Sequence, residues 1–244
     1  MTFERHGIDH LSASSLNLWM ANPREWAVRY LANEADDADE PAMWRGTAVE
    51  AGLACRFCGG STEQARAAAC DSFELNALGD LSDEVEAERG LVISMLDRAF
   101  GWTTPSDLAA TQLRIEHWLD GVQVPLIGYL DFAFSCGIDV DLKTTRACPS
   151  SPRGNHVRQV ALYRAARGRR GGLLYVTGKR LAYFEIGDQD AETALDDLRA
   201  AALSLSQFLG KVRNADEALA CLPYNPDDFR TTPKPSVDTI PLLG

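Results

Sequence analysis

The stretch IDVDLKTT, residues 138–145, places three charged side chains at every second position: Asp139, Asp141 and Lys143. Because alternate side chains share one face of a β-strand, these three would lie in a row. Burying them is costly unless an opposite charge or a bound cation compensates them. Three interpretations are therefore open: a solvated edge strand, a salt bridge, or a site that holds a metal ion.

A second acid lies one strand earlier. Asp131 belongs to GYLDFAF, and Cys136-Gly137 forms the turn before IDVDLKTT. Pairing about this turn would bring Asp131 near Asp141 and Lys143. Two carboxylates beside a lysine suit Mg2+, which binds oxygen, polarises a phosphate and activates water. Spacing alone favours a different interpretation, an exposed Asp–Lys ion pair that contributes less than about 1 kcal/mol to the stability of the fold.

The elements that must position these residues follow from the spacing of the apolar side chains. Helical spacing predicts segments within 10–34 (broken near Asn22-Pro23), 42–57, 62–77, 83–100, 155–167, 191–212 and 214–221. Strand-like spacing predicts segments at 111–119, 122–135, 138–145 and two within 171–187, with Asp120-Gly121 as a two-residue hairpin. A meander, a crossover helix and two further strands make a mixed sheet, so the expected fold class is α/β.

No repeat or linker marks a domain boundary in the 244 residues, which suffice for one sizeable core. We therefore expect a single domain over 1–244, with a helical region at about 10–100, a catalytic sheet and crossover helix at about 112–186, and C-terminal helices at 190–222 before a tail. No apolar run is long enough to span a bilayer, and the N-terminus lacks the apolar stretch of a signal peptide. These features predict a cytoplasmic protein without a membrane partner, whose six cysteines are reduced thiols.

Although the net charge is −11, the charges are not spread evenly along the chain. Between Lys143 and Arg180 there are ten Lys or Arg and no Asp or Glu. A local basic patch governs contact with a polyanion, whereas the net charge governs solubility. A solvated helix face followed by a basic turn explains the same pattern equally well.

Four short stretches decide between these interpretations when they are read in order: GTAVE (46–50), GYLDFAF (128–134), VDLKTT (140–145) and QVALYRAA (159–166). Together they resemble the nuclease domain of the phage and bacterial RecB-type exonucleases, within the PD-(D/E)XK nuclease superfamily. The opening LSASSLNLWMANPREWAVRYL is similar to the N-terminal helix of that family, and the resemblance covers roughly 10–185. It implies a restriction-endonuclease-like fold, a mixed β-sheet core flanked by helices with an N-terminal helical region. The implied activity is a DNA exonuclease of recombination and repair.

The resemblance also implies roles for individual residues. The catalytic positions are Asp131, Asp141, Lys143, Gln159 and Tyr163, and the metal positions are Glu50, Asp131, Asp141 and the backbone carbonyl of Leu142. Glu50 stands where the family usually carries a histidine ligand. Since carboxylate oxygens are harder ligands than imidazole, we expect an altered metal preference rather than loss of activity. Asp139 matches no motif position and is expected to be solvated at the start of its strand.

The cofactor expected from this resemblance is Mg2+ or Mn2+. Many relatives hold an iron–sulfur cluster, but Asn22 replaces the N-terminal cysteine and only Cys221 lies near the C-terminus, so we expect no cluster. The thiols of CRFC (55–58) and Cys70 are interpreted as buried structural cysteines rather than a zinc site. The glycine spacing of GGLLYVTGKR does not fit a phosphate-binding loop, so we expect no ATP site.

The expected partner is DNA. Six basic residues are predicted to follow its phosphates: Arg146, Arg153, Arg158, Arg164, Lys179 and Arg180. Two alternatives stay open: a catalytically inactive relative that binds DNA or protein, and the nuclease subunit of a helicase–nuclease complex with a recombination or helicase partner.

Overall fold

The computed structural model describes residues 2–33 and 40–223. In chain order the elements are α1 (Thr2–Arg5), α2 (Ala13–Ala21), α3 (Pro23–Ala27), the π-helix η1 (Val28–Ala32), α4 (Pro41–Phe57), α5 (Thr62–Ala77), α6 (Asp83–Ala99), β1 (Leu108–His117), β2 (Leu126–Phe134), β3 (Ile138–Thr144), α7 (Gly154–Arg167), β4 (Arg170–Val176), β5 (Leu181–Ile186), α8 (Asp188–Lys211) and α9 (Ala215–Cys221). Among the described residues, no helix combines the length and the apolar character needed to cross a bilayer.

The five strands form one mixed sheet in the order β1-β2-β3-β4-β5. Neighbouring strands are antiparallel except β3 and β4, which run parallel. A parallel neighbour requires a crossover, and α7 provides it. The turn between β2 and β3 is the one expected at Cys136-Gly137, where Gly137 has a φ of +87° that favours glycine. The predicted α/β meander, crossover helix and further strands are therefore confirmed.

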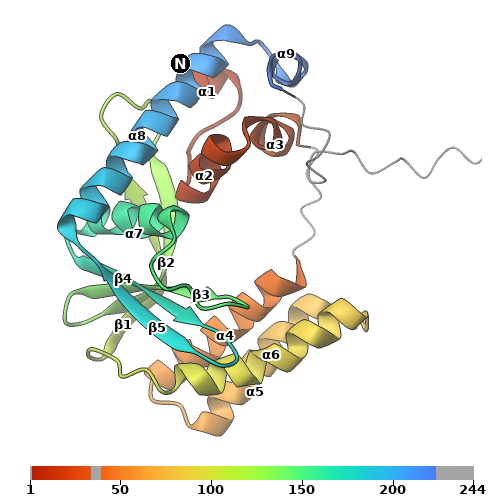
Figure 1. Cartoon of the computed structure of the whole chain (residues 1–244), viewed down its shortest axis with the longest axis vertical. Helices are drawn as coiled ribbons and strands as arrows, with labels where there is room; N and C mark the ends of the chain where they lie inside the picture. Colours follow the sequence, from red (N-terminus) through yellow and green to blue (C-terminus); the bar gives the residue numbers. More distant parts are fainter. Residues whose placement is uncertain (1, 34–39, 224–244) are drawn as a thin grey trace, which may run out of the picture.

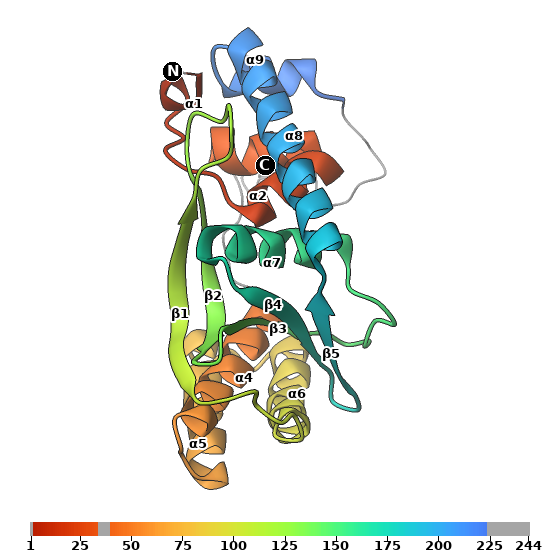
Figure 2. The same cartoon turned by 90° about the vertical axis from the view of Figure 1, so that its left-hand side faces the viewer.

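Helices cover both faces of this sheet (Figure 1). Helices α4, α5 and α6 pack against one face through Phe132, Val140 and Leu174, among others. Helices α7 and α8 lie on the other face, and Figure 2 shows α8 running from the end of β5 toward the N-terminal helices. Because side chains alternate along β3, Val140 and Leu142 point to the α4–α6 layer. The charged residues of β3 therefore face α7.

The prediction of a two-residue hairpin at Asp120-Gly121 is wrong, because the connection between β1 and β2 spans 118–125. Its apolar residues Leu119, Val122 and Val124 are buried in the core. The N-terminal segment also pairs there: the Leu11 N–H donates to the Pro125 carbonyl at 2.9 Å, and the Ile127 N–H donates to the Leu11 carbonyl at 2.7 Å. A contact between residues so far apart in sequence leaves no signal in the local turn chemistry.

A buried ion pair joins α4 to α6 beside the end of β3. Arg45 and Glu88 are 4% and 2% exposed, and the Arg45 guanidinium donates to the Glu88 carboxylate. Arg45 Nη2 also donates to the Thr144 carbonyl at 3.3 Å, and Arg146 pairs with the other Glu88 oxygen. The two helices and the strand are thereby fixed to one another.

Arg45→Met is expected to lower the free energy of unfolding by about 3 kcal/mol, because it leaves the Glu88 carboxylate buried without its main partner. Urea unfolding monitored by circular dichroism measures this change. Arg66→Met is the matched control: Arg66 pairs with Asp97 at 2.8 Å on the surface. Loss of such an exposed pair should cost less than about 1 kcal/mol. Equal losses in the two variants would contradict a stabilising role for the buried pair.

Candidate active site

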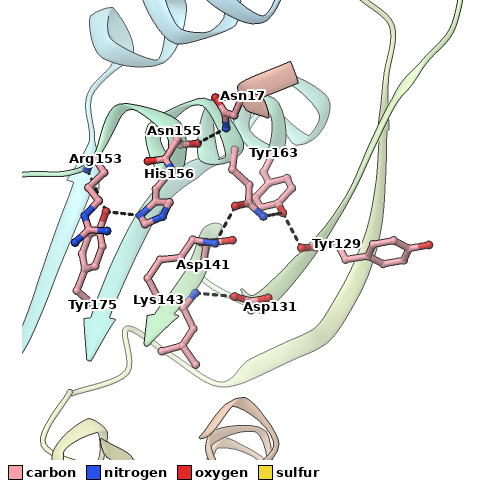
Figure 3. Close-up of polar contacts among 12 residues, drawn as sticks. Asn17, Tyr129, Asp131, Asp141, Lys143, Arg153, Asn155, His156, Tyr163 and Tyr175 are labelled. Carbon is pink, nitrogen blue, oxygen red and sulfur yellow. Dashed lines mark hydrogen bonds and ion pairs between the residues drawn. The ribbon is translucent and has the colours of Figure 1, made fainter. Parts of the chain in front are cut away.

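The two acids of GYLDFAF and VDLKTT meet across β2 and β3. Phe132 pairs with Val140 and Ala133 with Asp139, and continuing this register sets Asp131 opposite Asp141. Asp131 Oδ2 accepts a hydrogen bond from the backbone N–H of Leu142 at 2.7 Å. At this position a side-chain oxygen of β2, rather than a backbone carbonyl, therefore bonds the backbone of β3. Figure 3 shows Asp131, Asp141 and Lys143 gathered below α7. The expectation that the turn would bring these residues together is met.

A chain of polar contacts ties Lys143 to α7. Its Nζ lies 2.8 Å from Asp141 Oδ2 and donates to Gln159 Oε1 at 2.8 Å. Gln159 Nε2 donates to the Tyr163 hydroxyl at 2.7 Å. That hydroxyl donates to the Tyr129 carbonyl on β2 at 2.7 Å, and Figure 3 shows Tyr163 and Tyr129 side by side. Gln159 and Tyr163 are four residues apart on one helical face, so a single face of α7 carries both. The position of the Lys143 ammonium is therefore set by Asp141 on β3 and by Gln159 on α7.

The carboxylates make this site electronegative. Burial raises the pKa of Asp131 well above its usual range, and the nearby Asp141 and Glu50 carboxylates raise it further. Burial also raises the pKa of Asp141, although Lys143 opposes the shift, and burial raises that of Glu50. Burial alone would lower the pKa of Lys143, but the Asp141 and Asp131 carboxylates outweigh it and raise that pKa. One ammonium thus stands among three acids.

Asp141 provides the test of whether this site fits a divalent cation. The residue is 1% exposed, its Oδ2 lies 2.8 Å from the Lys143 ammonium, and its buried Oδ1 accepts no hydrogen bond from the described residues. A buried carboxylate oxygen without a partner is a donor that Mg2+ and Mn2+ prefer. Within 2–33 and 40–223, no three His, Cys, Asp or Glu side chains are grouped to hold a metal ion. Asp131 and Asp141 are thus the paired acids of the site, and Glu50 joins them through the Gln112 amide that it shares with Asp131.

Sequence reasoning missed Gln112, which lies on β1 beside the acids. Its Nε2 donates to Glu50 Oε1 and, at 3.2 Å, to Asp131 Oδ1. These bonds bring together α4, β1 and β2. No motif or periodicity singled out this residue, because its role depends on which strand lies next to β2.

His156 was also missed. Its Nδ1 lies 2.7 Å from the hydroxyl of Tyr175, and Tyr175 is paired with Lys143 across β3 and β4. Burial lowers the pKa of His156 to about 4, with a smaller contribution from Lys143 and Arg153, so the imidazole is neutral at neutral pH. Its position three residues before Gln159 on α7 was the available signal, since that spacing shares a helical face.

Asp139 corrects an expectation. It is 2% exposed rather than solvated, and it accepts a hydrogen bond from Arg167 Nε at 2.6 Å. Because β3 lies inside the sheet and its charged face is covered by α7, an acid at this position needs a buried partner. The row of charges on β3 therefore divides into a structural ion pair and the Asp141–Lys143 pair.

The basic residues predicted to contact DNA do not form one uncompensated patch. Three of the six form ion pairs with acids of α6 and α8: Arg146–Glu88, Arg158–Asp197 and Arg164–Asp188. The other three, Arg153, Lys179 and Arg180, are exposed and make no ion pair within the described residues. Their contact with DNA stays a prediction.

Cys55, Cys58 and Cys70, in and next to α4 and α5, were expected to be buried, and this is wrong. Cys55 is half-buried, whereas Cys58 and Cys70 are exposed. The buried faces of α4 and α5 are formed by other residues, including Leu53 and Phe73. The thiols therefore do not contribute to the core as proposed.

Comparison with solved structures supports the fold. The chain is similar to a "Putative exonuclease" from Eubacterium rectale, with a TM-score of 0.60 at 15% identity over 84% of this chain and 83% of that chain. The structure of SSO0001 matches with a TM-score of 0.36 at 19% identity over 65% of this chain and 74% of that one. The first likeness, with the five-stranded mixed sheet and its flanking helices, shows a restriction-endonuclease-like fold.

Comparison with curated proteins gives no significant match. The family model for the PD-(D/E)XK nuclease superfamily matches residues 10–236, nearly the whole chain. That span contains the acids of β2 and β3, the lysine of β3 and the glutamine and tyrosine of α7. The chain therefore belongs to the PD-(D/E)XK nuclease superfamily.

Proposed function

We propose that this protein is a Mg2+- or Mn2+-dependent DNA exonuclease that hydrolyses phosphodiester bonds in recombination or repair. The observation that carries the proposal is the meeting of Asp131 with Asp141 and of Asp141 with Lys143, whose Nζ is 2.8 Å from the Asp141 carboxylate. Superfamily membership supports the nuclease activity. The likeness to a structure described as a "Putative exonuclease" supports the exonucleolytic mode.

In this proposal Asp131, Asp141 and the Leu142 carbonyl would hold the cation, and Glu50 would take the place of the usual histidine. Once bound, a divalent cation would polarise the scissile phosphate and lower the pKa of a bound water. In the metal-free protein Lys143 keeps its proton at neutral pH, since the adjacent carboxylates raise its pKa. The ammonium therefore acts as a donor that orients water or stabilises charge on the phosphate, not as a base.

Gln159 and Tyr163 act on Lys143 rather than on DNA. Gln159 accepts from the ammonium, and Tyr163 connects that amide to the β2 backbone. Burial and the Asp141 carboxylate raise the pKa of Tyr163, so its hydroxyl stays neutral and keeps donating. The pair holds Lys143 in one position, which conserves the geometry that a transition state requires.

We further propose that the chain acts as one nuclease domain with DNA as its partner. Residues from the first helices, from β1 and β2, and from α8 share a single core, which supports one folding unit. The exposed Arg153, Lys179 and Arg180 are the residues proposed to contact phosphates. A recombination or helicase partner would bring DNA ends to this site.

The experiment that tests the proposal is digestion of end-labelled linear and closed-circular DNA, single- and double-stranded, with Mg2+, Mn2+ or EDTA. An exonuclease should degrade linear DNA from its ends in metal and leave closed circles intact. Cleavage of the circles would reassign the protein as an endonuclease. If neither metal supports cleavage of any DNA form, the nuclease proposal is wrong and a binding role for this fold is favoured.

A further inference from the structure

The side-chain amide of Gln112 lies between two acids of the candidate site, Glu50 and Asp131. Its single amide nitrogen donates to Glu50 Oε1 and, at 3.2 Å, to Asp131 Oδ1. Because an amide nitrogen carries two hydrogens, both bonds form at once. Two carboxylates from different elements thus converge on one atom of partial positive charge. A cation held jointly by Glu50 and Asp131 would need the same position.

The backbone at Gln112 is strained. Thr111 pairs with Phe132 and Leu113 with Leu130, and this register sets Gln112 opposite Asp131. Within this strand Gln112 has a φ of +46°, in the left-handed region that non-glycine residues rarely adopt. Such strain persists only where the surroundings hold the residue in place, and it is concentrated at functional positions. The strained residue is the one whose side chain reaches both acids.

We propose that Gln112 is an internal competitor of the metal ion. In the metal-free protein its amide stands between Glu50 and Asp131, and it leaves this position when a cation binds to both carboxylates. The inference rests on the proposed metal-dependent function and adds to it a residue that sets metal affinity. The metal ion then binds only after the hydrogen bonds from the Gln112 amide to Glu50 and Asp131 break. The apparent metal affinity is therefore lower than it would be if the amide did not occupy the site.

The surroundings of Gln112 allow this exchange. The residue is exposed, so its side chain can rotate toward solvent without disturbing the core. Asp131 keeps its bond from the Leu142 N–H at 2.7 Å and so stays in place when the amide leaves. A divalent cation replaces two neutral donors with a full double charge, which favours the exchange in an electronegative site.

The test uses Gln112→Met, which keeps the length of the side chain and removes its donors. Titration calorimetry with Mn2+ should give a dissociation constant about tenfold lower than that of the wild type, because the amide contacts to the two acids, with the net strength of an ordinary hydrogen bond, no longer oppose binding. The Tm in EDTA should fall, and the rise in Tm on adding Mn2+ should grow. Gln207→Met, at an exposed position of α8, is the matched control and should behave as the wild type.

Gln112→Gly gives a second variant that removes the donors and relieves the left-handed strain, so it should also bind Mn2+ more tightly. Weaker Mn2+ binding in both variants would make Gln112 a ligand and overturn the proposal. An equal fall in Tm with and without Mn2+, at unchanged affinity, would make it purely structural and also overturn it. If the wild type binds neither Mn2+ nor Mg2+, the proposed function itself fails, a result distinct from either of these.

Discussion

Asp131→Asn is expected to reduce cleavage of linear DNA about a thousandfold, the scale at which removal of a group that stabilises developing charge lowers turnover. An amide is a neutral and weaker ligand for a hard cation than a carboxylate. The substitution should leave the fold intact, since the Asn oxygen can still accept the Leu142 N–H that Asp131 Oδ2 accepts. Initial rates on end-labelled DNA at saturating Mn2+ measure the loss.

The same variant should be more stable than the wild type in EDTA at neutral pH. Burial and the neighbouring acids raise the pKa of Asp131 in the folded state. A raised carboxyl pKa costs stability as the pH rises above the ordinary carboxyl range, and the cost is complete above the folded-state pKa. The gain in Tm from Asp131→Asn should therefore grow from acid to neutral pH and shrink when Mn2+ is added.

Asp71→Asn, at an exposed position of α5, is the matched control for both measurements and should change neither. Retention of wild-type cleavage by Asp131→Asn would show that Asp131 is not a metal ligand. A Tm that falls in EDTA at neutral pH would instead show that the carboxylate stabilises the metal-free fold.

Lys143→Met is expected to separate catalysis from metal binding. Cleavage should fall at least about a hundredfold, because the donor proposed to act on the reacting phosphate is lost. Mn2+ should bind at least as tightly as in the wild type, because the ammonium 2.8 Å from Asp141 no longer repels the cation. The Tm in EDTA should fall, since Asp141 is buried and loses its counter-charge.

Single-turnover cleavage and Mn2+ calorimetry on the same preparation distinguish these effects. Lys211→Met, at the exposed end of α8, is the control and should match the wild type in both measurements. If Lys143→Met loses Mn2+ binding along with cleavage, the lysine holds the site together rather than acting on the phosphate. Unchanged cleavage would remove Lys143 from the proposed mechanism.

Local spacing determined the parts of the site that lie within or next to a single element. The alternation in IDVDLKTT places Asp141 and Lys143 on one face of β3, and the short turn at Cys136-Gly137 sets Asp131 opposite Asp141. The four-residue spacing of Gln159 and Tyr163 places both on one face of α7. These relations extend over a few residues, so strand and helix periods were enough to predict them.

Tertiary structure decided which charges are compensated and by what. Arg167 forms a buried ion pair with Asp139. Acids of α6 and α8 pair with three of the six residues expected to bind DNA, namely Arg146, Arg158 and Arg164. Gln112 enters the site only because β1 pairs with β2 and α4 packs beneath them. Such contacts join side chains separated by tens of residues. Local periodicity carries no information about them, because it reports which face a residue occupies and not which distant element covers that face.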